Sequence, residues 1–182
     1  MFIIILNLMK NDFVHLHLHS QYSLLDGAIK FDELFDEVAR QGMSAVALTD
    51  HGNLFGAYDF YKLGKKNNIK PIIGCEVYIT KDRTKKTPEN NKTHHLTVLC
   101  MNIKGYENLC SLVSAGHLEG FYRKPRIDRE LLFEKSEGLI VLSGCLNSEV
   151  CHNILKGKKD EALRIASEYK NALGDRYFIE IQ

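Results

Sequence analysis

Three histidines alternate with apolar residues near the start of the sequence. His15, His17 and His19 recur with a period of two within residues 13–19. Because side chains two positions apart lie on the same face of a β-strand, the spacing predicts a strand with three imidazoles on one face. A lone buried histidine is most often a hydrogen-bonded core residue, whereas neighbouring imidazoles are typical of a metal site. The segment therefore predicts metal ligation.

Further candidate ligands lie at or near the ends of other predicted strands. They are Asp26, Asp50, His51, Glu76, His95 and Cys145. Taken singly, Asp26 is typical of a turn, Asp50 of a helix cap and Cys145 of a small buried hydrophobe. Glu76 interrupts an apolar strand, where an acid needs a cationic partner. Together they exceed the three or four ligands of one zinc ion, which indicates two or three ions that share carboxylates.

Strands and helices alternate from residue 13 onward, and they must position these side chains. The hydrophobic patterns predict strands at 13–19, 45–49, 71–80, 95–101, 139–143 and 177–181, and helices at 31–41, 55–67, 104–117 and 162–173. This order predicts an α/β fold with a parallel sheet and right-handed crossovers, open or closed into a barrel. In such folds the loops after the strands build the site.

Composition limits the class of protein. The chain has 182 residues, of which 45% are hydrophobic and 26% charged, so it can bury the core of one domain. With a net charge of +1, the chain as a whole has no electrostatic field strong enough to attract nucleic acid, so such a partner would have to be held by a local patch. Five cysteines without a CxxC pair favour a reducing, cytoplasmic setting. Residues 1–12 form an extension. Its apolar part, 2–8, predicts an edge strand or a misplaced start, and it is far shorter than the roughly 20 residues of a membrane helix.

Several motifs together resemble a known family. The chain is similar from residue 13 to residue 182 to the PHP (polymerase and histidinol phosphatase) domain that begins the alpha subunits of bacterial DNA polymerase III. The motifs are HLHLHS at 15–20, SLLDGA at 23–28, LTDHGNLFGA at 48–57, KPIIGCEVYI at 70–79, HLTVL at 95–99, LEGFYRKPRIDRELL at 118–132 and GLIVLSGCL at 138–146. The GFYRKPRID and SGCL segments favour the polymerase branch over other PHP proteins.

The resemblance implies a fold and a ligand set. The fold is a distorted (β/α)7 PHP barrel, here truncated at its C-terminal end, because the family's last Asp and His motif would follow Gln182. The cofactor is a di- or trinuclear cluster of divalent metal ions, with zinc favoured and manganese or iron as alternatives. The implied ligands are His17, His19, Asp26, His51, Glu76, His95 and Cys145, with His15 and Asp50 as outer-sphere partners.

The resemblance also implies a function. The site would be a metal-dependent phosphoesterase linked to 3′–5′ proofreading in a protein that carries out DNA replication. Its partners would be a DNA 3′ end, the rest of the alpha subunit and an exonuclease subunit, with no membrane. DNA synthesis belongs to a palm domain in this family and is not expected of this chain. The alternatives are a non-catalytic docking domain and a free-standing phosphatase of the histidinol-phosphate type.

Overall fold

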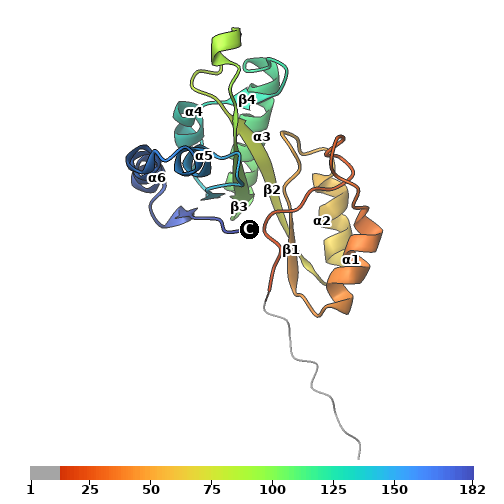
Figure 1. Cartoon of the computed structure of the whole chain (residues 1–182). Helices are drawn as coiled ribbons and strands as arrows, with labels where there is room; N and C mark the ends of the chain where they lie inside the picture. The colour runs from red at the N-terminus through yellow and green to blue at the C-terminus, as the bar shows by residue number, and fades with distance from the viewer. Residues whose placement is uncertain (1–12) are drawn as a thin grey trace, which may run out of the picture.

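The computed structural model describes residues 13–182, in which helices cover one mixed β-sheet (Figure 1). The strands are β1 (Ala45–Leu48), β2 (Lys70–Ile79), β3 (His94–Cys100), β4 (Arg126–Ile127), β5 (Leu139–Leu142) and β6 (Tyr177–Phe178). The helices are α1 (Phe31–Arg40), α2 (Ala57–Lys66), α3 (Ile103–Leu118), α4 (Arg129–Glu134), α5 (Glu149–Leu155) and α6 (Lys159–Leu173). The α/β class that the sequence predicts is therefore confirmed.

The strand directions differ from the prediction of a parallel sheet. The order is β1-β2-β3-β5-β6, with β4 paired to β2. The pairs β1–β2, β2–β4 and β5–β6 are parallel, but β3 runs antiparallel to both β2 and β5. The prediction is wrong for β3 because the connection from β2 contains only a short 3-10 turn, Pro88–Asn90. A parallel crossover usually needs a helix, whereas this loop returns the chain beside the strand it left.

The two faces of the sheet have different roles. Along β2, Cys75, Val77 and Ile79 are buried in the main core, which also holds apolar side chains of α3 to α6. The alternate positions, Glu76 and Tyr78, point to the opposite face because successive strand residues change sides. The face away from this helical core is therefore free to hold polar side chains.

A second core fixes the other end of the sheet. Phe31, Leu34, Phe35 and Val38 recur with the helical period and are all buried on one side of α1. They belong to a cluster that includes residues of β1 and α2. Figure 1 shows α1 and α2 together beside β1, away from α4, α5 and α6.

The chain ends of the described part lie side by side. Residues 13–19 are extended but do not form a regular strand: the Ala47 amide donates to the His15 carbonyl at 2.8 Å, and the Thr49 amide to the Leu18 carbonyl at 2.9 Å. The step from His15 to Leu18 is three residues, whereas the step from Ala47 to Thr49 beside it is two. This extra residue interrupts the regular hydrogen-bond ladder. The predicted strand at 177–181 is shorter, Tyr177–Phe178. The predicted edge strand at 2–8 lies outside the described residues.

Candidate metal centre

A buried carboxylate lies at the middle of the candidate site. Glu76 is only 1% exposed and projects from β2. Four imidazole nitrogens surround its carboxylate: His95 Nδ1 at 2.7 Å, His51 Nδ1 at 2.8 Å, His19 Nε2 at 3.2 Å and His17 Nε2 at 3.5 Å. Four basic side chains therefore surround this acid. The sequence predicts such cationic partners because Glu76 interrupts an apolar strand.

The imidazoles reach Glu76 from three segments. The backbone of residues 13–19 places His17 and His19 with their Nε2 atoms 3.0 Å apart. His51 follows β1 and its backbone forms an isolated bridge with Glu76. His95 lies on β3, directly opposite Tyr78 of the neighbouring strand β2. Residues that are far apart in the sequence therefore converge at one end of the strands.

The geometry between His51 and Glu76 fits a cation. His51 Nδ1 and Glu76 Oε2 are buried and have no hydrogen-bond partner within residues 13–182, although they are 2.8 Å apart. Buried polar atoms are normally satisfied, so an unpaired nitrogen facing an unpaired carboxylate oxygen needs an explanation. Zinc binds imidazole nitrogen at about 2.0–2.1 Å in a tetrahedral site, which puts neighbouring ligand atoms about 3.3 Å apart, within the 2.7–3.5 Å range of the four contacts of Glu76. The donor set and its spacing therefore fit a divalent metal ion.

Three overlapping groups of side chains could each hold an ion. They are His17, His19 and Glu76; His19, Asp26 and His51; and His51, Glu76 and His95. Asp26 is the exposed member, with Oδ2 2.9 Å from His51 Nε2. Cys145 Sγ lies 3.6 Å from both Glu76 Oε1 and His95 Nδ1. The structure thus brings together all seven residues that the sequence nominates as ligands.

Asp50 acts on the imidazoles only through another side chain. It is 1% exposed and accepts hydrogen bonds from the Ser20 amide at 2.7 Å, the Ser20 hydroxyl at 2.8 Å and the Ser23 hydroxyl at 2.7 Å. The Ser23 hydroxyl oxygen in turn accepts from the His51 amide at 3.1 Å and lies 3.3 Å from His19 Nδ1. Ser23, which the sequence analysis does not nominate, therefore links Asp50 to two candidate ligands.

His15 is in none of the three groups of side chains that could hold an ion, although it lines the same hollow as His17 and His19. Its side chain is exposed, and its ring packs edge-on against Phe13 with ring centroids 4.9 Å apart. The extra residue in this segment explains the difference, because it interrupts the strict alternation that would have placed three imidazoles on one face.

Glu180 is a residue of the candidate site that the sequence analysis missed. Its Oε1 lies 2.6 Å from His17 Nδ1, and its Oε2 accepts from the Thr97 hydroxyl at 3.1 Å. This contact directs the other ring nitrogen of His17 toward Glu76. The signal was available, since Glu180 is an acid between Ile179 and Ile181, just as Glu76 interrupts an apolar strand.

Electrostatics favour positive charge at the centre. Burial opposes protonation of His17, but its contacts with Glu180 and Glu76 prevail and raise its pKa to about 9. Burial likewise disfavours the charged form of Glu76, yet the surrounding imidazoles hold the pKa of its carboxyl well below the usual range. The pocket is therefore built to keep Glu76 ionised and to place positive charge around it.

An aromatic side chain supports the imidazoles. The Tyr78 ring stacks on His51 at 5.8 Å between centroids and meets His95 edge-on at 5.1 Å. The Lys124 ammonium lies 4.4 Å from the centroid of the same ring. Burial and the nearby Glu76 charge raise the pKa of Tyr78 to about 12, so its hydroxyl stays neutral at physiological pH.

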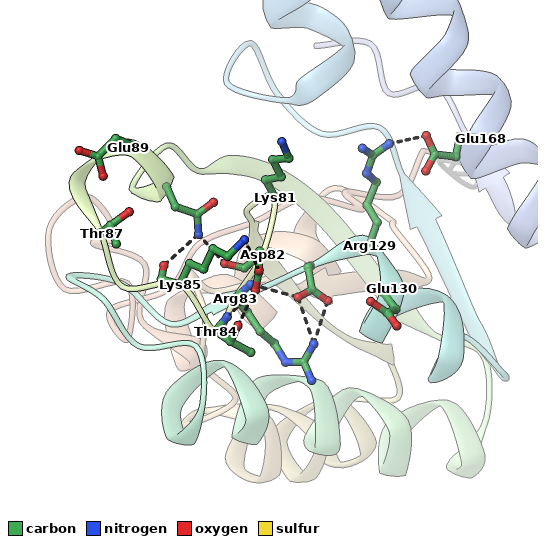
Figure 2. A pocket seen from close by; sticks show the side chains of 12 residues that line it. Lys81, Asp82, Arg83, Thr84, Lys85, Thr87, Glu89, Arg129, Glu130 and Glu168 are labelled. Carbon is green, nitrogen blue, oxygen red and sulfur yellow. Dashed lines mark hydrogen bonds and ion pairs between the residues drawn. The ribbon is translucent and has the colours of Figure 1, made fainter.

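A hollow elsewhere in the described residues does not have the chemistry of a site. Figure 2 shows this cavity of about 750 Å³, bordered by residues of the 81–90 loop and by the start of α4. Its cations face acids: Arg83 pairs with Asp128 at 3.0 Å and Arg129 with Glu168 at 2.6 Å. Mutually neutralised side chains leave little charge for a ligand, so the candidate site remains the cluster around Glu76.

Across residues 13–182, no helix has the length and apolar character needed to cross a membrane.

Comparisons with known proteins identify a family and several relatives. The PHP domain family matches residues 15–182. The chain is 46% identical over 180 residues to a DNA polymerase III subunit alpha of Deinococcus radiodurans, covering 93% of this chain and 14% of that protein. The corresponding subunit of Aquifex aeolicus is 47% identical over 182 residues, covering 96% and 16%, and that of Thermus aquaticus is 48% identical over 179 residues, covering 95% and 15%.

Solved structures give a weaker likeness. A two-domain protein from Bacteroides vulgatus, described as containing a predicted PHP-like metal-dependent phosphoesterase, aligns with a TM-score of 0.49 and 16% identity over 85% of this chain and 41% of that one. The chain spans only about one seventh of the length of the curated relatives named above. On the strength of the match over residues 15–182, the chain belongs to the PHP domain family.

Proposed function

We propose that this chain is the PHP domain of a bacterial DNA polymerase III alpha subunit and that its metal centre hydrolyses the terminal phosphodiester at a DNA 3′ end. The similarity to three such subunits supports the first part. The second part depends on one observation, the convergence of four imidazoles on the buried carboxylate of Glu76. Its partners are then the DNA 3′ end, the remaining polypeptide of the alpha subunit and an exonuclease subunit.

The centre would hold two or three divalent ions. The ligands are His17, His19, Asp26, His51, Glu76, His95 and Cys145. Imidazole and thiolate donors favour zinc, while the carboxylates also suit manganese or iron. When bound, such ions supply an activated water and neutralise charge on the attacking and leaving oxygens of a phosphoryl displacement.

The protein's own side chains define how a substrate enters. Asp26 has a side chain that is 57% exposed, whereas that of Glu76 is only 2% exposed, so the cluster is open to solvent on the side of Asp26. Glu76 contacts several imidazoles at once, and its carboxylate would help to hold the ions together with those imidazoles. Glu180, Ser23 and Tyr78 hold the imidazoles in position and do not need to touch the substrate.

The test compares two glutamate variants of the purified chain. Nucleotide release from a 3′-end-labelled oligonucleotide is measured with added zinc or manganese, for the native chain, Glu76→Gln and Glu107→Gln. Glu107 lies on the exposed surface of α3 and serves as the matched control. We expect release that depends on metal, survives in Glu107→Gln and is lost in Glu76→Gln. Release of equal rate in both variants, or no release by the native chain, would refute the proposed activity.

A further inference from the structure

Three lysines without acidic partners among residues 13–182 gather near the start of β3, the strand that carries His95. Lys92, Lys156 and Lys158, here called the lysine cluster, are exposed, and none has a carboxylate within ion-pair distance among residues 13–182. Lys92 instead donates to an imidazole, with Nζ 2.7 Å from His152 Nε2. A cation that donates to a neutral acceptor keeps its full positive charge available.

The lysines raise one another's electrostatic energy. Burial and the charges of Lys156 and Lys158 lower the pKa of Lys92. The acid whose field opposes this effect is Glu149, but its carboxylate already accepts a hydrogen bond from the Tyr169 hydroxyl at 2.8 Å. Like charges that are not compensated cost folding energy, and an anion bound among them would remove that cost.

One backbone carbonyl connects the lysine cluster to the candidate ligands. The carbonyl of Asn147 accepts the His95 amide at 3.2 Å and contacts His94 Nδ1 at 3.0 Å. The His94 ring meets the His152 ring edge-on at 5.1 Å. His95 and His94 point to opposite sides of β3, so the lysine cluster lies across the strand from the candidate ligand His95, at the end of β3 where both histidines lie.

We propose that the lysine cluster binds the phosphate backbone of a single-stranded nucleic acid whose 3′ end lies in the metal centre. The inference rests on the proposed function for its substrate and adds a binding surface to it. Charge complementarity identifies the occupant: three flexible ammonium groups near the start of β3, the strand that carries the candidate ligand His95, match the regularly spaced phosphates of an extended strand. An acidic peptide shares the charge but has no reason to lie next to a site that cleaves phosphate esters.

The experiment measures binding separately from hydrolysis. A 5′-fluorescent oligonucleotide with phosphorothioate linkages at its 3′ end is titrated with the native chain, and affinity is followed by anisotropy from 50 to 200 mM salt. The comparison is the triple variant Lys92→Gln, Lys156→Gln, Lys158→Gln. Each phosphate contact to a single strand contributes about 0.7 to the slope of log affinity against log salt, so three contribute about 2. We expect the slope of the triple variant to be less steep than that of the native chain by about 2. Between 50 and 200 mM salt, the native chain should therefore lose about 20-fold more affinity than the variant.

A matched variant controls for net charge. Lys65, Lys66 and Lys70 are also exposed, and they lie at the end of α2 and the start of β2, away from the metal centre. Their triple replacement by glutamine removes the same charge and is expected to bind like the native chain. Equal loss in both triple variants, or native binding by the cluster variant, would overturn the proposal. So would a cluster variant that loses only the binding of poly-glutamate, since the surface would then dock acidic protein. If the native chain releases no nucleotide but its binding still depends on the lysine cluster, only the proposed activity is contradicted.

Discussion

His17 and Glu180, which are 163 positions apart, meet at 2.6 Å between Nδ1 and Oε1. This contact joins the two ends of the described chain at the metal centre, as Figure 1 shows for the chain path. Because the carboxylate holds one nitrogen of the ring, the other nitrogen, Nε2, faces His19 and Glu76. The orientation of one candidate ligand therefore depends on a residue at the far end of the sequence.

Replacing Glu180 should weaken metal binding. Partners that orient a ligating histidine typically contribute 10- to 100-fold in metal affinity. We expect Glu180→Ala to lose about that much, and Glu180→Gln to lose less because its carbonyl oxygen can still accept from His17. Competition with a zinc chelator measures the affinity. Glu107→Ala, a surface control, should bind like the native chain, and native affinity in Glu180→Ala would contradict the role assigned to this carboxylate.

Removing the Ser23 hydroxyl should disturb two ligands at once. This oxygen contacts the His51 amide and His19 Nδ1 and donates to Asp50. Ser23→Ala leaves the buried Asp50 carboxylate with one donor fewer, which costs about 1–3 kcal/mol of unfolding free energy, and it frees the His19 ring. We expect reduced stability and about tenfold weaker zinc binding. Ser111→Ala on the exposed surface of α3 is the control, and identical zinc affinity in both variants would count against this role.

Sequence periodicity predicted the long elements well, for physical reasons. Phe31, Leu34 and Phe35 are buried on one side of α1 because a helix repeats every 3.6 residues. Glu76 stood out because an acid in an apolar strand requires a partner. The structure places four imidazoles around Glu76, and the metal itself stays a prediction.

Other features could not be predicted because they depend on contacts distant in sequence or on single caps. α4 and α5 have 6 and 7 residues, too few to show a hydrophobic period, and each begins at a side-chain cap, Asp128 or Ser148. The reversed direction of β3 depends on how the 80–93 loop folds back. The contact of Glu180 with His17 depends on the closure of the chain ends, which no local pattern records.

Metal removal should lower thermal stability. An ion that binds the folded chain adds about 2.7 kcal/mol at 100 times its dissociation constant, which corresponds to a rise of about 5–10 °C in Tm for a domain of this size. We expect chelation to reverse this rise in the native chain, as followed by calorimetry with and without zinc. Glu76→Gln should show little response to zinc. A zinc response of the same size in this variant would place the stabilising ion elsewhere.

Arg126 should stabilise the 81–92 loop rather than the chemistry. It is fully buried, and its guanidinium donates to the backbone carbonyls of Gly120, Asn90, Arg83 and Lys85 at 2.8–3.3 Å. In Arg126→Met these carbonyls lose their donor, and each orphaned acceptor costs about 1–3 kcal/mol unless water reaches it. We therefore expect a loss of about 3 kcal/mol or more, a fall of about 6–12 °C in Tm, and faster tryptic cleavage within the loop. Arg40→Met, which removes an exposed partner of Glu37, should change stability by less than about 0.5 kcal/mol. If the two variants were equally stable, the buried guanidinium would not be what holds the loop.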